Sequence, residues 1–161
     1  MQNLTYAGIG SRDTPESILK ALFSIGAYMA FHGWILHSGG AKGADQAFQD
    51  GCESVKGPMR IFRPHQAMVS SEAYEIAAKF HPAWDRCSQY ARLLHARNSY
   101  QVLGLDLKTP VRMVICYTKN GARQGGTGQA LRIAKHYGVP IFDLGTDNLD
   151  IIQGIKDIVE P

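Results

Sequence analysis

Apolar and polar residues follow two different periods along this chain. Short apolar runs, bounded by polar or turn residues, predict strands over residues 5–9, 33–37, 60–62, 111–117 and 141–142. Between these runs, apolar residues recur at helical spacing and predict helices over residues 15–32, 44–52 and 129–137. A longer helical stretch fills residues 70–103 and is broken at Pro82, and a last helix carries Leu149, Ile152, Ile155 and Val159.

The alternation of strands with helices predicts the architecture. We expect an α/β fold, namely a Rossmann-like three-layer domain with a mostly parallel sheet and helices on both faces. Thr14 is the expected N-cap of the first helix, with Pro15 at its first position. The 161 residues show no linker and no internal repeat, so we expect one domain over residues 1–161.

Glycine-rich strings stand at three of the predicted junctions between strand and helix. They are GIGSR at residues 8–12, SGGAKGAD at residues 38–45 and GGTG at residues 125–128. Glycine lets backbone N–H groups approach an anion closely, and the positive end of the helix dipole stands behind them. Because ligands bind at the carboxyl ends of parallel strands, the three strings predict one shared nucleotide or phosphate pocket.

Composition limits the class of protein. The apolar fraction of 45% and the charged fraction of 19% are typical of a globular domain, and no apolar run approaches the roughly 20 residues of a membrane span. The three cysteines are odd in number and widely spaced, which predicts reduced thiols and a cytoplasmic location. The six histidines show no metal-ligand spacing, so we expect neither a metal nor a cofactor.

Charge is unevenly distributed along the chain. The net charge is only +3, and residues 143–161 are mainly acidic. Basic residues gather in the middle third, at Arg60, Arg63, Lys79, Arg86, Arg92 and Arg97. This distribution favours an anionic ligand or nucleic acid, and a solvated helix face is the alternative interpretation.

Several common nucleotide-binding and hydrolase motifs are absent. The first glycine string lacks the third glycine of GxGxxG, and the second strand ends in His37-Ser38 instead of the acidic residue that binds an adenosine ribose. These departures disfavour an ordinary NAD-linked dehydrogenase. The chain contains neither GxxxxGK[ST] nor GxSxG, which disfavours a Walker-type hydrolase and a nucleophilic Ser38.

Taken together, five strings resemble the SLOG superfamily. They are YAGIGSR at residues 6–12, SGGAKGAD at 38–45, ARN at 96–98, GGT at 125–127 and GVPI at 138–141. The superfamily contains the DNA-processing protein DprA and the LOG cytokinin-activating phosphoribohydrolases, and the SGGAKGAD string is closest to DprA. The resemblance covers residues 6–144. It implies a Rossmann-like nucleotide-binding domain that is often dimeric, with the helical segment 70–103 as the candidate interface.

The resemblance also implies which residues form the pocket. Gly39, Gly40 and Gly43 would cradle a phosphate, and Asp45 would either accept from a ribose hydroxyl or stabilise the dipole of its own helix. The full set of implied ligand-binding residues is Gly10, Ser11, Arg12, Ser38, Gly39, Gly40, Lys42, Gly43, Asp45, Arg97, Asn98, Thr118, Gly125, Gly126 and Thr127.

One departure from the superfamily concerns catalysis. LOG enzymes carry a PGGxGTxxE-like string whose Glu is catalytic, whereas this chain has QGGTGQALR at residues 124–132. A carboxylate for glycosidic cleavage would have to come from Asp45, Glu72 or Glu75. Residues 65–71 are a candidate lid over the pocket, and a role at a helix start is the alternative for Glu72.

Three functions fit these observations. The leading hypothesis is a small protein that binds, senses or sequesters a nucleotide or a nucleotide-derived signal without chemistry. One alternative is a DprA-like single-stranded DNA binder in recombination, since Tyr74, Trp84, Tyr90 and Tyr100 stand among arginines. The other is a LOG-like nucleotide N-glycosidase.

Overall fold

One parallel sheet organises this chain, whose computed structural model describes residues 3–65, 68–146 and 150–161. In these residues five strands follow the order β3-β2-β1-β4-β5, all parallel. They are β1 (Thr5–Gly10), β2 (Ile35–Ser38), β3 (Met59–Ile61), β4 (Met113–Tyr117) and β5 (Ile141–Asp143). The direction of winding reverses between β1 and β4, which makes their carboxyl ends the topological switch point.

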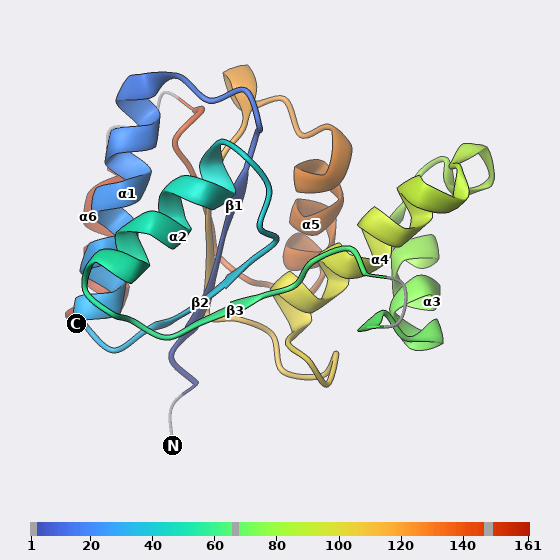
Figure 1. Cartoon of the computed structure of the whole chain (residues 1–161), viewed down its shortest axis with the longest axis horizontal. Helices are drawn as coiled ribbons and strands as arrows, with labels where there is room; N and C mark the ends of the chain where they lie inside the picture. The colour runs from blue at the N-terminus through green and yellow to red at the C-terminus, as the bar shows by residue number, and fades with distance from the viewer. Residues whose placement is uncertain (1–2, 66–67, 147–149) are drawn as a thin grey trace.

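Helices cover both faces of the sheet, as Figure 1 shows. One face carries α1 (Glu16–Phe31), α2 (Ala44–Ser54) and α6 (Ile151–Val159), and the other carries α3 (Ser71–Phe80), α4 (Gln89–Leu103) and α5 (Gly125–His136). Short 3-10 helices, η2 (Trp84–Arg86) and η3 (Lys119–Gly121), lie in two of the connections. The predicted three-layer α/β Rossmann-like fold is therefore confirmed.

The central strand β4 explains the two hydrophobic cores. Its side chains alternate between the faces, so Met113 and Ile115 pack towards α1, α2 and α6, while Val114 and Cys116 pack towards α4 and α5. A parallel strand covered on both faces must be apolar at every position. This requirement accounts for the uninterrupted apolar run from which the strand was predicted.

Two glycines bring α1 and α2 into close contact. A Cβ placed on Gly51 of α2 would collide with the carbonyl oxygen of Phe23 on α1, and one placed on Gly26 would lie 2.5 Å from the carbonyl oxygen of Phe48. The absence of a side chain at Gly51 therefore lets α2 pack closely against α1.

The helical stretch 70–103 forms an arm of two helices that projects from the sheet (Figure 1). The predicted break at Pro82 is confirmed, because α3 ends at Phe80 and α4 begins at Gln89. Each helix starts at a serine N-cap. The hydroxyl of Ser70 accepts from the N–H of Ala73 (3.3 Å), and that of Ser88 accepts from the N–H of Ala91 (3.1 Å).

Two predicted helix starts are wrong. The first helix begins at Glu16 and not at Pro15, and Thr14 does not cap it, because its hydroxyl donates to the carbonyl oxygen of Ser11 (2.6 Å). The helix α5 begins at Gly125, so the glycines assigned to a loop form its first turn. Leu149 of the predicted last helix lies outside the described residues. In the described part of the chain, no helix has both the length and the apolar character needed to cross a membrane.

Candidate functional site

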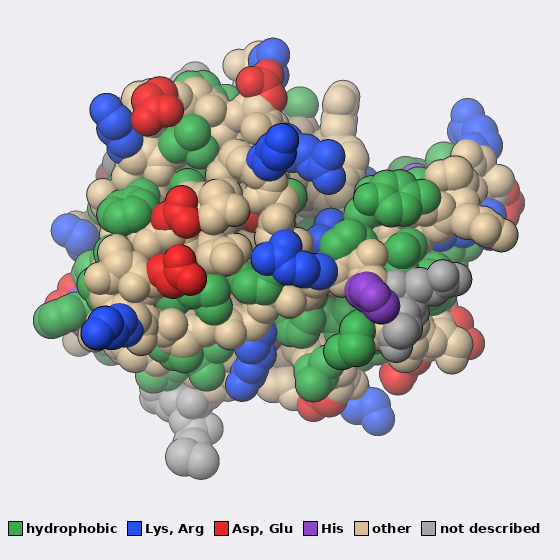
Figure 2. Space-filling view, viewed as in Figure 1, with side chains coloured by type: hydrophobic (Ala, Val, Ile, Leu, Met, Phe, Trp, Pro, Cys, Tyr) green, Lys and Arg blue, Asp and Glu red, His purple; other side chains and the backbone are tan. Residues whose placement is uncertain are grey.

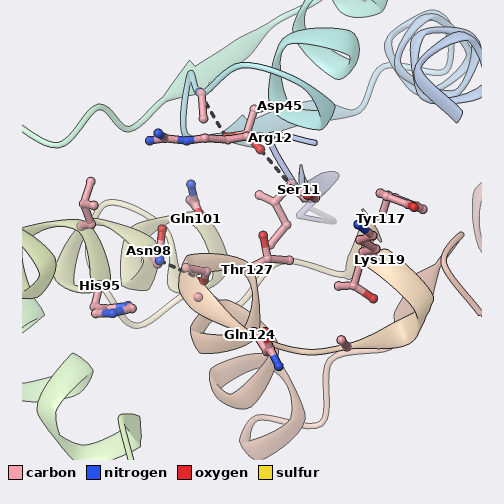
Figure 3. Close-up of a pocket in the computed structure, with 18 of the residues that line it drawn as sticks. Ser11, Arg12, Asp45, His95, Asn98, Gln101, Tyr117, Lys119, Gln124 and Thr127 are labelled. Carbon is pink, nitrogen blue, oxygen red and sulfur yellow. Dashed lines mark hydrogen bonds between the residues drawn. The ribbon is translucent and has the colours of Figure 1, made fainter. Parts of the chain in front are cut away.

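A cavity of about 710 Å³ opens at the carboxyl ends of β1 and β4, at the topological switch point. Its walls come from the ends of these strands, from one face of α4 and from the first turn of α5. Figure 3 shows Asn98 and Gln101 reaching it from α4, Thr127 from α5, and Asp45 and Arg12 from the opposite side. The volume and the position of this cavity are typical of small-molecule sites in open α/β sheets.

Ten of the fifteen predicted site residues line this cavity. They come from five separate parts of the sequence, which the parallel sheet brings to one edge. They are Gly10, Ser11, Arg12, Asp45, Arg97, Asn98, Thr118, Gly125, Gly126 and Thr127. The binding role of each remains a prediction.

The other five, all in the string 38–43, do not line the cavity. The hydroxyl of Ser38 is buried and donates to the carbonyl oxygen of Gly8 (2.6 Å). Gly43 has a φ of 81°, and a Cβ there would lie 2.5 Å from the carbonyl oxygen of Arg12, so this glycine serves a tight backbone crossing. Gly39 and Gly40 offer carbonyl oxygens to the side chains of Arg97 and Arg63, and Lys42 is exposed.

Asp45 accepts hydrogen bonds from backbone amides of the first and second glycine strings. One of its carboxylate oxygens accepts from the N–H of Gly10 (3.2 Å) and the other from the N–H of Ala41 (3.3 Å). The N–H of Gly39 contributes a further bond to this carboxylate. Of the three glycines predicted to cradle a phosphate, Gly39 thus directs its amide to a carboxylate of the protein itself, and the phosphate-binding role of Gly39, Gly40 and Gly43 stays a prediction.

The charge state of Asp45 follows from its surroundings. Burial raises the pKa of Asp45 to about 6, while the amide donors and the Arg97 guanidinium act in the opposite direction. Asp45 is also the one carboxylate among the described residues that line the cavity. Glu72 and Glu75 are exposed on α3 and do not line it. The predicted lid, residues 65–71, includes residues 66–67, which lie outside the described part.

Arg97 forms the buried floor of the cavity. Its Nη1 donates to the carbonyl oxygens of Gly39 (2.8 Å) and Phe62 (3.1 Å), and its Nε donates to Oδ1 of Asn98 (3.0 Å). Desolvation lowers the pKa of Arg97, and the carboxylate of Asp45 counteracts this effect. The buried guanidinium therefore connects α4 to the ends of β2 and β3.

The first turn of α5 supplies the free amides of the site. Gly128 is the first residue of this helix whose N–H donates a backbone hydrogen bond, to the carbonyl oxygen of Gln124 (3.0 Å). In the described structure the N–H groups of Gly125, Gly126 and Thr127 have no partner, and all three residues line the cavity. Free amides at a helix start attract an anion.

Basic side chains surround the opening of the cavity. Arg12 follows β1 and Lys119 follows β4, and both are exposed residues that line the cavity. Figure 2 shows Lys and Arg side chains over the middle of this face, between the sheet and the arm of α3 and α4. Thr118 contributes no free hydroxyl, because its hydroxyl and its N–H both donate to the carboxylate of Asp143.

Sequence reasoning missed several lining residues. Leu94 and Gln101 of α4 line the cavity together with Arg97 and Asn98, at helical spacings of three, four and seven residues. This periodicity was available in the sequence once Arg97 had been placed. Lys119 was also accessible to prediction, because it lies two residues after the end of the clearest strand. His37 does not line the cavity and lies 3.1 Å from Arg60, from its Nε2 to Nη1.

No protein-family model and no curated protein matches this sequence. Among solved structures, this chain is similar to the molybdenum cofactor carrier protein from Chlamydomonas reinhardtii, with a TM-score of 0.55. The similarity covers 98% of this chain and 85% of that protein, at 16% sequence identity. At this identity the two proteins share a fold, and the similarity says nothing of individual site residues.

Proposed function

We propose that this chain is a single SLOG-type domain that binds a nucleotide or a nucleotide-derived phosphate ligand in the cavity at the switch point. The observation that carries the proposal is the first turn of α5, where three unpartnered amides stand beside the cations of Arg12 and Lys119. A phosphate group is the natural ligand of such an arrangement. The proposed phosphate subsite is therefore at the third glycine string and not at the second.

The remainder of the cavity suits the rest of such a ligand. Gln101 and Asn98 place amide groups on the α4 side and Asp45 places a carboxyl group on the opposite side (Figure 3), while Tyr90 and Leu94 offer apolar surface. A pocket with apolar walls and a few fixed polar groups is typical of small-molecule recognition. The carrier role of the Chlamydomonas protein, which has the same fold, agrees with binding without chemistry.

Hydrolysis is the less favoured alternative. Glycosidic cleavage requires a carboxylate that is free to act on a water or on the sugar. In the described residues the cavity offers only Asp45, and both of its oxygens already accept amide hydrogens. We therefore propose binding, sensing or sequestration as the role of the site.

A second candidate function is single-stranded DNA binding on the arm. There the guanidinium of Arg92 lies 5.1 Å from the ring centre of Trp84, and Tyr90 is 62% exposed. Exposed rings beside arginines can stack on bases. Dimerisation through the same arm, which the superfamily resemblance implies, stays a prediction that light scattering of the purified chain will test.

The proposal is tested by a thermal-shift panel of nucleoside mono-, di- and triphosphates, ADP-ribose, cyclic nucleotides and a short oligonucleotide. A ligand at about 100 times its Kd stabilises by roughly 2.7 kcal/mol, which raises Tm by about 5–10 °C in a domain of this size. Stabilisation by the oligonucleotide alone, lost steeply with salt, would favour the second candidate.

Matched lysine variants locate the site. Lys119→Ala removes a cation at the opening of the cavity, and we expect it to weaken binding of the stabilising nucleotide by about tenfold. Lys42→Ala removes an equally exposed cation that does not line the cavity, and it should leave affinity unchanged. Equal losses in both variants, or no stabilisation by any compound, would contradict the proposed site.

A further inference from the structure

Three potential metal ligands meet at the connection between the two helices of the projecting arm. His81, Cys87 and His95 each offer a ligand atom, and these atoms all lie within 4.8 Å of one another. The sequence spacings of six and eight residues belong to no common metal motif, so the histidines were expected to be unrelated. The grouping is produced by the tertiary structure.

The connection between α3 and α4 builds this cluster. His81 ends α3, the chain turns through Pro82 and η2, and Cys87 follows directly. The N–H of Arg86 and the thiol of Cys87 both donate to the carbonyl oxygen of Ala83, at 3.0 and 3.5 Å. His95 then comes from the second turn of α4, which packs against α3. The turn is thus fixed by its own hydrogen bonds.

The distances are those of a nearly formed coordination shell. The Sγ of Cys87 lies 3.8 Å from both Nδ1 and Nε2 of His81. In a tetrahedral zinc site, bonds of about 2.3 Å to sulfur and 2.0 Å to nitrogen place these two ligand atoms roughly 3.5 Å apart. The rings of His81 and His95 are also close, with their centres 4.4 Å apart. Small side-chain movements would therefore bring the three ligand atoms to coordination distances around one ion.

His95 supplies an independent sign of a missing partner. The residue is only 9% exposed, and its Nδ1 is buried without a hydrogen-bond partner in the described structure. A buried polar nitrogen without a partner is destabilising, and such groups in native proteins call for an explanation.

The surrounding charges define which ligand must be anionic. The guanidinium of Arg132 acts electrostatically on both His81 and His95, although it donates to the carbonyl oxygen of Phe80 (3.0 Å) and to Oε1 of Gln129 (2.7 Å). A cation bound beside this charge needs a negative ligand. The thiolate of Cys87 is the one group of the cluster that supplies it.

We propose that His81, Cys87 and His95 bind a divalent transition-metal ion of the zinc type. Imidazole and thiolate are the ligands that such ions prefer over magnesium or calcium. One histidine contact changes on binding, because the N–H of Ala83 now donates to Nδ1 of His81 (3.0 Å). Three protein ligands leave one position for water or another small ligand. Since His95 also lines the cavity, the ion would fix this wall of the candidate nucleotide site.

Cobalt provides the most specific probe. The purified full chain is reduced, stripped of metal with a chelator and titrated with Co²⁺, while Zn²⁺ affinity is measured by competition with a chromophoric chelator. We expect one ion per chain, a thiolate-to-cobalt charge-transfer band, and displacement of Co²⁺ by Zn²⁺. Zn²⁺ should also raise Tm, since a ligand of the folded state stabilises it.

Single substitutions test the assignment. Cys87→Ser should abolish the charge-transfer band and weaken Zn²⁺ binding by more than about 100-fold, because even outer-shell partners contribute 10–100-fold. His81→Gln should weaken binding similarly, and both side chains are only half-buried, which favours folding of the variants. Cys52→Ala is the matched control, since this thiol lies in the opposite core, and it should retain the band.

The outcomes are decisive in both directions. Absence of a charge-transfer band in the native chain, or its persistence in Cys87→Ser, would overturn the metal site. Loss of the band in Cys52→Ala as well would also overturn it, if that variant is folded by circular dichroism. Nucleotide binding is measured separately in chelator, so failure of the metal proposal leaves the proposed function untouched.

Discussion

Asn98 on α4 donates a hydrogen bond from Nδ2 to the carbonyl oxygen of Gly126 on the first turn of α5, over 3.0 Å. The Oδ1 of the same amide accepts from Nε of Arg97 (3.0 Å). Both ends of the Asn98 side chain are thereby used. The start of α5, with its free amides, is held in a fixed orientation above the buried guanidinium.

Replacing Asn98 with Asp tests this relationship. The Asn98→Asp side chain has nearly the same volume but cannot donate to Gly126, and it adds a negative charge beside the free amides of α5. We expect the affinity for an anionic nucleotide to fall by at least about tenfold, because the hydrogen bonds from the α5 amides to the phosphate would be weakened. A hydrogen bond to a charged group is worth about 1.5–3 kcal/mol. Isothermal titration calorimetry measures this loss.

The control for added charge is Gln89→Glu, at the exposed first residue of the same helix and outside the cavity. It should bind the nucleotide normally. Normal binding by Asn98→Asp would exclude the first turn of α5 as the phosphate subsite.

The buried carboxyl of Asp45 should make stability depend on pH. Burial raises its pKa to about 6 from an ordinary value of 3.8, so between pH 4 and 6 the folded state holds a proton that the unfolded state has released. The free energy of unfolding contributed by Asp45 therefore falls as pH rises through this window, by at most about 3 kcal/mol, and is constant above it.

Urea unfolding of the native chain and of Asp45→Asn from pH 4 to 7 isolates this contribution. Burial lowers the pKa of His37 to about 4, so His37 acts in the opposite direction: its neutral form is favoured on folding, and stability is lost as pH falls from about 6.5 to 4. Because both proteins contain His37, its effect cancels. The native-minus-variant difference should decrease with pH, and an increase would show that Asp45 has a lowered pKa.

The contact of Gly51 with Phe23 predicts a stability change whose sign is informative. Helix propensity alone would make Gly51→Ala more stable by about 1 kcal/mol. The new Cβ, however, would collide with the carbonyl oxygen of Phe23, and overpacking typically costs about 1–3 kcal/mol. We expect a net loss of at least about 1 kcal/mol in urea unfolding. Glu53→Ala, exposed on the same helix, is the control and should change stability little.

The site could be predicted only as far as strand ends could be located. Once β1 and β4 were recognised, parallel pairing had to bring Gly10 and Thr118 to the same edge. For the second glycine string, the sequence pattern does not tell where the backbone amides point. In the structure the amide of Ala41 donates to Asp45, a residue of the same string, and so does the amide of Gly10 at the end of β1.

The sequence by itself determined the alternation of strands and helices, the apolar core strand and the break at Pro82, because these follow from local periodicity and backbone chemistry. Only the tertiary structure decided the free amides of α5, the position of Arg97 below the cavity and the meeting of His81, Cys87 and His95. These depend on how α4 packs against the sheet and against α3. Such packing sets side-chain directions between residues far apart in the chain, which no local pattern records.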